Sequence, residues 1–171
     1  MARGRRLGVD VGKVRIGVAV SDPDAVLATP LLTLPRDGAG WSALAEAGAA
    51  RDESAEDQTV RARTTWPADV AALARLVAEY DAVEVIVGLP VTLAGTESYA
   101  AVYVREYAQV LAEAVAPVAV RLTDERMSTA VATRRLSERG VRAGRRRAVV
   151  DQAAAVEILQ SWLDATRRRD A

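Results

Sequence analysis

The sequence contains neither cysteine nor histidine among its 171 residues. Without cysteine the chain cannot form disulfide bonds or thiolate metal sites, which is typical of proteins from a reducing compartment such as the cytoplasm. Without histidine, serine–histidine triads, histidine general bases and histidine zinc sites are excluded. Catalysis must therefore use carboxylates, hydroxyls, arginines or the single lysine, Lys13. Sites built from carboxylates favour hard divalent cations such as Mg²⁺ or Mn²⁺.

Long apolar runs are also missing. No stretch reaches the roughly 18 apolar residues that a membrane-spanning helix needs. The first six residues, Met1–Arg6, lead directly into a predicted strand and lack the hydrophobic region of a secretory signal. We therefore expect a cytoplasmic protein without a membrane segment. The length suits a single domain, residues 1–171, with a sizeable core.

The formal net charge is zero, but the charges are separated along the chain. The segment from Arg121 to Arg147 carries nine arginines against three acids. Its densest part contains Arg142, Arg145, Arg146 and Arg147. The guanidinium group matches the geometry of a phosphate, so these four arginines are candidate nucleic-acid contacts. The alternative interpretation is a solvated run of charge.

The acids instead concentrate between residues 37 and 66, where six acids stand against three arginines. This segment is rich in Ala, Gly, Ser and Thr and shows no stable periodicity. We interpret residues 37–66 as an acidic surface insertion, with a short helix near residues 41–50.

The pattern of apolar residues predicts five strands and several helices. The strands are expected at about 6–11, 14–21, 25–34, 83–87 and 118–122, and the helices from Pro67, at about 97–115, 128–139 and 149–165. Pro30 places the third strand at an edge of the sheet. Three strands joined by tight turns, followed by alternating helices and strands, predict the α/β class. The sheet should be mixed, with the first three strands antiparallel, strands one, four and five parallel, and helices on both faces.

Asp10 is a lone carboxylate within the first, apolar strand. Because side chains alternate along a strand, Leu7 and Val9 share one face, while Asp10 lies on the other between Gly8 and Gly12. A buried ionised carboxylate is costly unless it is paired or bound to a cation. Asp10 is therefore either a structural acid satisfied by its neighbours or a functional one, with space beside it for a ligand.

A tight turn at Gly12-Lys13 is predicted to join the first two strands. Val14, Ile16 and Val18 would then continue the apolar face of the second strand. Lys13 would lie at the tip of the hairpin, where it is either solvated or in contact with a phosphate.

Two further carboxylates are expected close to Asp10. Asp151 lies on the inward stripe of the last predicted helix, at its first turn, although the helix dipole alone could favour an acid there. Asp124 and Glu125 follow the fifth strand, and ligands gather at the carboxyl ends of parallel strands. Asp10, Asp151 and one of these two acids would together form a plausible two-metal phosphoryl-transfer site.

Four sequence blocks give the chain a family resemblance. They are Gly8-Val-Asp-Val-Gly-Lys-Val-Arg-Ile-Gly-Val-Ala-Val-Ser-Asp22, Val87-Gly-Leu-Pro90 with Gly95-Thr-Glu97, Leu122-Thr-Asp-Glu-Arg-Met-Ser-Thr129, and Val150-Asp-Gln-Ala-Ala-Ala155. Any one block is a weak signal, but the ordered set is specific. The chain resembles the YqgF/RuvX family of Holliday-junction resolvase-like nucleases, within the RNase H-like superfamily.

The resemblance implies a three-layer RNase H-like fold and a cytoplasmic bacterial nuclease that uses Mg²⁺ or Mn²⁺. Its implied function is processing of the 5′ end of pre-16S ribosomal RNA during ribosome biogenesis, or cleavage of branched DNA. By that likeness Asp10, Glu125 and Asp151 are the catalytic, metal-binding carboxylates. The implied supporting residues are Arg15, Arg126 and Ser128.

Three functions stay open at this point. The first is a metal-dependent endonuclease acting on structured RNA or branched DNA. The second is a nucleotide-binding enzyme, since the opening hairpin is also similar to the phosphate-binding hairpin of actin and sugar-kinase ATPases, which need two such domains. The third is a non-catalytic RNA-binding factor in ribosome assembly. The sequence does not fix the oligomeric state, and either a monomer or a homodimer is compatible with it.

Overall fold

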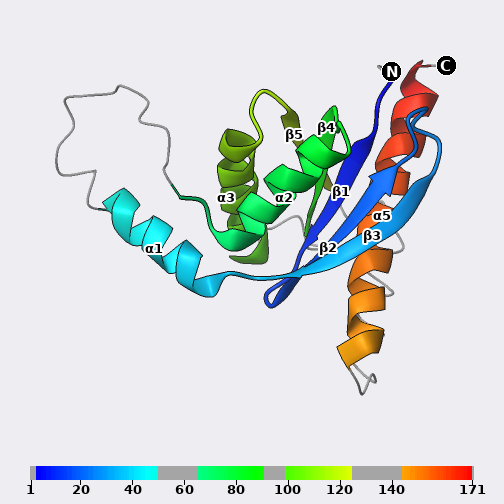
Figure 1. Cartoon of the computed structure of the whole chain (residues 1–171). Helices are drawn as coiled ribbons and strands as arrows, with labels where there is room; N and C mark the ends of the chain where they lie inside the picture. Colours follow the sequence, from blue (N-terminus) through cyan, green and yellow to red (C-terminus); the bar gives the residue numbers. More distant parts are fainter. Residues whose placement is uncertain (1–2, 50–64, 91–98, 125–143, 171) are drawn as a thin grey trace.

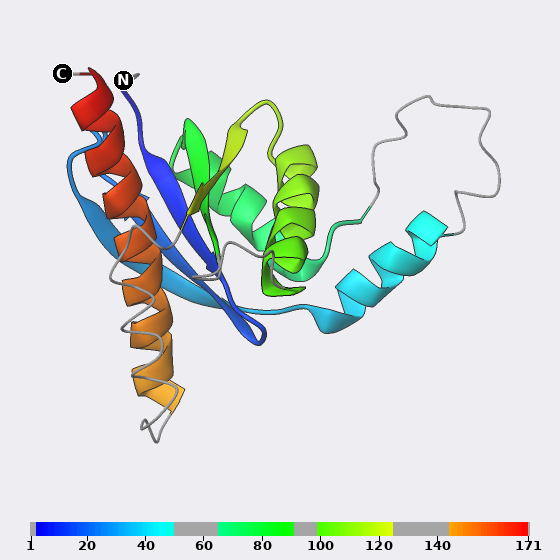
Figure 2. The same ribbon diagram turned by 180° about the vertical axis from the view of Figure 1, so that it is seen from behind.

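The computed structural model describes residues 3–49, 65–90, 99–124 and 144–170, which form a three-layer α/β structure (Figure 1). A five-stranded sheet of order β3-β2-β1-β4-β5 is the middle layer. Two helices, α2 and α3, cover one face, and the long helix α5 crosses the other, as Figure 2 shows from behind. The predicted α/β architecture with helices on both faces is confirmed.

The strands are β1 (Arg6–Val11), β2 (Arg15–Ser21), β3 (Ala28–Pro35), β4 (Glu84–Leu89) and β5 (Ala119–Asp124). The described helices are α1 (Gly38–Ala49), α2 (Ala68–Glu79), α3 (Tyr99–Ala114) and α5 (Gly144–Asp170). The helix predicted at residues 128–139 lies outside the described residues.

Strand directions follow the prediction. β1 pairs antiparallel with β2, and β2 antiparallel with β3. β1–β4 and β4–β5 are parallel pairs. β3 is an edge strand, as Pro30 predicted, because proline cannot donate to a second neighbour. The carboxyl ends of β1, β4 and β5 therefore meet at one end of the sheet.

The hairpin between β1 and β2 differs from the prediction by one residue. Val11 pairs with Ile16, and the Gly12 N–H donates to the Arg15 carbonyl at 2.9 Å, so the two loop residues are Lys13 and Val14. Val14 is 70% exposed and does not continue the apolar face as expected. The sequence pattern alone missed this, because a valine next to a strand looks the same whether it ends the turn or begins the strand.

The two faces of the sheet have different chemistry. Leu7, Val9 and Ile16 are buried in the main apolar core with α2 and α3. The opposite face carries small residues where α5 crosses, and a Cβ added to Gly8 would lie 2.6 Å from Leu159 Cβ. Because Gly8 of β1 and Gly17 of β2 have no side chain, α5 approaches the backbone of both strands closely.

Helix α5 is longer than predicted at both ends, since residues 149–165 were expected. We interpreted Gly144 and its following arginines as a connection, but arginine and alanine are strong helix formers, and the helix continues through them. At the other end, Arg167, Arg168 and Arg169 lie in the last turn, where positive charge complements the helix dipole.

A buried ion pair joins the elements on the α2–α3 side. Arg36 Nε lies 2.8 Å from Asp69 Oδ2, and both side chains are almost fully buried. The Arg36 guanidinium carbon lies 5.5, 5.0 and 4.8 Å from the ring centroids of Trp41, Tyr103 and Tyr107. The Trp41 indole N–H donates to Asp69 at 3.1 Å. This cluster fixes the start of α1 against α2 and α3.

The predicted short helix in the acidic segment corresponds to α1. Asp37 accepts hydrogen bonds from the N–H of Gly40 at 2.9 Å and of Ala68 at 2.8 Å, so one carboxylate caps the starts of both α1 and α2. These bonds hold the pKa of Asp37 below its usual range. Residues 50–64 of the segment lie outside the described residues, and its role as a surface insertion stays a prediction.

Glu157 on α5 gives a pH-dependent stability prediction. Its Oε2 atom is buried and makes no hydrogen bond among the described residues, and burial raises the pKa of this carboxyl above its ordinary value of 4.5. An acid with a raised folded-state pKa loses stability as the pH rises above its unfolded-state pKa. We therefore expect Glu157→Gln to raise the free energy of unfolding at pH 7 by up to about 1 kcal/mol.

Urea unfolding at pH 7 and at pH 4 measures this effect. At pH 4 the Glu157 carboxyl is largely protonated in both states, so the gain should nearly vanish. The exposed Glu79→Gln on α2 is the control for a change of net charge. An equal gain at both pH values would show that burial of the charge is not the cause.

Candidate active site

Asp10 is buried close to the carboxyl end of β1, with 3% of its surface exposed. It lies on the α5 face of the sheet, in line with Gly8 and opposite the apolar face of Leu7 and Val9. This is the alternation predicted from the sequence. An ionised carboxylate at this depth is costly unless it is paired or bound to a cation.

Asp151 on α5 lies directly over the residue paired with Asp10. That residue is Gly17 of β2, and a Cβ added to it would lie 2.0 Å from the backbone oxygen of Asp151. Because Gly17 pairs with Asp10, this contact places the backbone of Asp151 over the strand neighbour of Asp10. The predicted convergence of these two carboxylates is consistent with this arrangement.

The predicted position of Asp151 within its helix is wrong. Because α5 begins at Gly144, Asp151 lies in the third helical turn and not in the first. The helix dipole acts within the first turn and cannot account for an acid at this place. The interpretation of Asp151 as a residue that only complements the dipole therefore does not hold.

Arg15 contacts Asp151 across the site. Its Nε lies 3.4 Å from Asp151 Oδ2, and both side chains are 31% exposed. Charge-assisted hydrogen bonds are usually about 2.7–2.9 Å, so this is a loose ion pair. Arg15 therefore offsets part of the negative charge of Asp151.

The hairpin beside Asp10 is held from the opposite face of the sheet. The backbone N–H of Arg36 donates to the Val14 carbonyl at 3.0 Å. The Nη1 atom of the Arg36 side chain lies 3.4 Å from the Gly12 carbonyl. Lys13 is exposed at the tip of this hairpin, as predicted, at the end of the sheet that carries Asp10. The burial of Arg36 could not be predicted, because the sequence pattern around a buried arginine does not differ from that around an exposed one.

Asp124 does not share a face with Asp10. It ends β5 and pairs with Leu89, which belongs to the core on the α2–α3 side. Arg121 and Thr123 are the β5 residues in line with the α5 face. Asp124 is thereby set apart from the site, and Glu125, the next residue, is the remaining candidate at this strand end.

Several predicted site residues lie outside the described residues. These are Glu125, Arg126, Ser128 and Arg142. Arg145, Arg146 and Arg147 belong to the first turn of α5, between one and two turns before Asp151. Their roles stay predictions.

The donor set suits a hard divalent cation. Asp10 and Asp151 supply carboxylate oxygens, which Mg²⁺ and Mn²⁺ prefer, and the close packing of α5 on Gly8 and Gly17 brings the helix that carries Asp151 down onto the strand that carries Asp10. Within the described part of the chain there is no group of three acidic metal-ligating side chains. A complete three-carboxylate site would need a residue such as Glu125.

Gly17 is a residue of the candidate site that the sequence analysis did not single out. Only its neighbours Ile16 and Val18 were considered, as parts of the apolar face of the second strand. Its importance comes from the close approach of α5, which cannot be known before the helix is placed. The available signal was the run of Gly17 and Ala19 on one face of a strand whose other face is bulky.

A family model described as "RuvX: Holliday junction resolvase" matches residues 4–52 and 47–165. The chain belongs to the RuvX family. The predicted family resemblance is confirmed, and with it the prediction that this chain belongs among nuclease relatives.

Relatives of this RuvX chain share about half of its residues. A protein of Nocardia farcinica named "Putative pre-16S rRNA nuclease" is 49% identical over 162 residues, which are 95% of this chain and 78% of the relative. A protein of the same name from Mycobacterium tuberculosis is 50% identical over 162 residues, with 95% and 79% covered. The match extends over nearly the whole chain.

A solved structure confirms the fold. A chain titled "T. thermophilus RuvC in complex with Holliday junction substrate" gives a TM-score of 0.50 at 14% identity, over 95% of the RuvX chain and 96% of that chain. At this identity the likeness concerns the fold alone, and it supports the predicted RNase H-like architecture. None of the helices in the described residues is long and apolar enough to cross a membrane.

Proposed function

We propose that this RuvX-family protein is a metal-dependent endonuclease that processes the 5′ end of pre-16S ribosomal RNA. The observation that carries the proposal is the buried Asp10 on β1 with Asp151 held over its neighbour Gly17. The names of the relatives support the RNA substrate. The lack of histidine leaves carboxylates as the chemical groups of the site.

The proposed mechanism assigns a role to each carboxylate. A bound divalent cation supplies a water of lowered pKa and neutralises the leaving oxygen. Asp10 and Asp151 would hold Mg²⁺ or Mn²⁺, with Glu125 as the third carboxylate. Arg15 would balance the charge of Asp151 before the metal binds and meet the scissile phosphate afterwards.

The proposed substrate contacts are basic or hydroxyl side chains. They are Lys13, Arg15, Arg126, Ser128, Arg142, Arg145, Arg146 and Arg147. Such contacts to phosphate set the position of a nucleic acid but do not read its sequence or distinguish RNA from DNA.

A cleavage assay with two substrates tests the proposal. A labelled pre-16S 5′-leader RNA and a four-way DNA junction are each incubated with Mg²⁺, Mn²⁺ or EDTA. We expect cutting of the RNA with either metal and none with EDTA. Cleavage that persists in EDTA would contradict the metal-dependent mechanism.

The second candidate function is resolution of branched DNA, which the description of the RuvX family favours. Preferential cutting of the four-way DNA junction in the same assay would favour this second function. Symmetric cutting of two strands requires two active sites, so a homodimer would be expected in that case, whereas an RNA nuclease can act as a monomer. Binding of RNA without cleavage would instead favour the non-catalytic assembly factor.

A further inference from the structure

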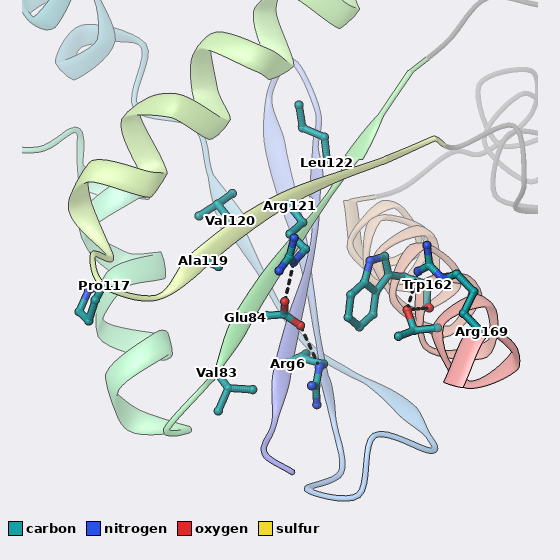
Figure 3. A pocket seen from close by; sticks show the side chains of 11 residues that line it. Arg6, Val83, Glu84, Pro117, Ala119, Val120, Arg121, Leu122, Trp162 and Arg169 are labelled. Atoms are coloured by element: carbon teal, nitrogen blue, oxygen red, sulfur yellow. Dashed lines mark hydrogen bonds and ion pairs between the residues drawn. The ribbon is translucent and has the colours of Figure 1, made fainter. Parts of the chain in front are cut away.

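A pocket of about 840 Å³ opens at the end of the sheet opposite Asp10 (Figure 3). The strands contribute Arg6, Glu84 and Arg121 to its lining, and α5 contributes Trp162 and Arg169. Its volume is in the range of pockets that take small ligands, roughly 300–1,000 Å³. None of these five residues has a role in the proposed active site.

The lining carries an excess of positive charge. Glu84 is shared between two guanidinium groups, with its Oε2 3.2 Å from Arg6 Nε and its Oε1 2.5 Å from Arg121 Nε. Arg169 adds a third positive charge. Arg6 is 2% exposed, so its charge is held where solvent screens it poorly. One carboxylate cannot balance three arginines, and the pocket therefore favours an anion.

Trp162 gives the pocket an aromatic wall. It packs partly against the apolar residues between α5 and the sheet, such as Ile86 and Leu159, and it also lines the pocket. The guanidinium carbon of Arg6 lies 5.7 Å from its ring centroid. Aromatic side chains beside arginines are the usual means of binding single-stranded nucleic acid without sequence preference.

We propose that this pocket binds one unpaired nucleotide of a nucleic-acid strand, with its base against Trp162 and its phosphate against Arg121 and Arg169. Arg121 is the more accessible of the two strand arginines, since 58% of its side chain is exposed. The pocket would thus be a substrate-holding site separate from the carboxylates.

The position of the pocket connects it to the active site. Arg6 and Asp10 point to the same face of β1 and are four residues apart, which is about 13 Å along a strand. Because α5 covers the face between them at Gly8, a nucleic acid held at Trp162 would reach the carboxylates by passing alongside α5. In this sense the inference rests on the proposed function, because both sites would engage the same substrate strand.

Binding of a short, dye-labelled single-stranded RNA in EDTA tests the inference, with fluorescence anisotropy as the measurement. The double variant Arg121→Gln/Arg169→Gln is compared with Arg75→Gln/Arg105→Gln, which removes the same charge from exposed positions on α2 and α3. We expect about 10-fold weaker binding for the pocket variant and less than about twofold for the control. The salt dependence of the pocket variant should fall by about 0.7 in slope, because one phosphate of the single strand is no longer neutralised.

A second pair of measurements tests the base contact. Trp162→Leu is expected to weaken binding about 10-fold, within the roughly 1–3 kcal/mol of a base–aromatic stack. Inorganic polyphosphate should compete at least about 10-fold less well than the RNA. Equal competition by polyphosphate, or equal loss in the two arginine variants, would overturn the assignment of a nucleotide site.

The assay separates this inference from the proposed function. It needs neither metal nor cleavage, and the residues that it varies have no role in the proposed active site. Binding at the pocket without cleavage of any substrate would support the pocket and contradict the nuclease. Cleavage by the wild type, together with unaltered RNA binding in the pocket variants, would support the nuclease and contradict the pocket.

Discussion

Asp10→Asn is expected to lower the rate of metal-dependent cleavage on the order of 10³-fold, because a ligand worth several kcal/mol of transition-state stabilisation is lost. Asparagine has nearly the same shape and keeps one oxygen, so the buried position on β1 should remain packed. The rate is measured by single-turnover cleavage of the substrate that the wild type prefers, with Mg²⁺ and with Mn²⁺.

Thermal unfolding separates a loss of metal binding from a loss of fold. Mg²⁺ should raise the melting temperature of the wild type by mass action and leave that of Asp10→Asn unchanged. The control is Asp81→Asn, an exposed residue with a φ of 47°, a backbone conformation that asparagine adopts readily. If Asp10→Asn cut as fast as Asp81→Asn, the carboxylate mechanism would be wrong.

Gly17→Ala is expected to reduce the cleavage rate by about 10²-fold although Gly17 bears no chemical group. The added Cβ would lie 2.0 Å from the backbone oxygen of Asp151, so α5 must move away from β2. A displacement of about 1 Å in a catalytic constellation is enough for an effect of this size. Because the distance between two metal ligands would increase, half-maximal activity should also need more Mg²⁺.

Gly38→Ala is the matched control, since a Cβ at Gly38 meets nothing within 4 Å. The metal requirement is the informative measurement, because a variant that is only less stable would lose active molecules without changing it. Activity of Gly17→Ala within about twofold of Gly38→Ala, at the same Mg²⁺ requirement, would show that the close approach of α5 does not position Asp151.

The strands of the fold could be predicted where the local sequence pattern agrees with the contacts that the strand makes in the folded protein. The alternation of Leu7, Val9 and Asp10 was read correctly because one face of a strand must be apolar to be buried. Proline at position 30 placed β3 at the edge because it has no N–H to donate. Where a local signal was ambiguous the prediction failed, as at Val14, which the sequence alone could assign to either the turn or the strand.

The candidate site was predicted in part. Asp10 and Asp151 were singled out because charged residues on apolar stripes are unusual, and their catalytic role stays a prediction. The choice between Asp124 and Glu125 needed the register of β5 on β4, which puts Asp124 opposite Leu89 on the other face. A shift of one residue reverses the face of a side chain, and no property of two adjacent acids reveals which face each takes.

The sequence by itself determined the kinds of chemistry open to this protein. Without histidine or cysteine, carboxylates and arginines were the main groups available for catalysis and phosphate binding. The ordered motifs indicated the RuvX family. Only the tertiary structure decided the roles of Gly17, Arg36 and Trp162. Their roles depend on which surfaces meet after folding: a glycine is a contact site only once a helix lies on it, and an arginine is buried only once aromatic rings surround it.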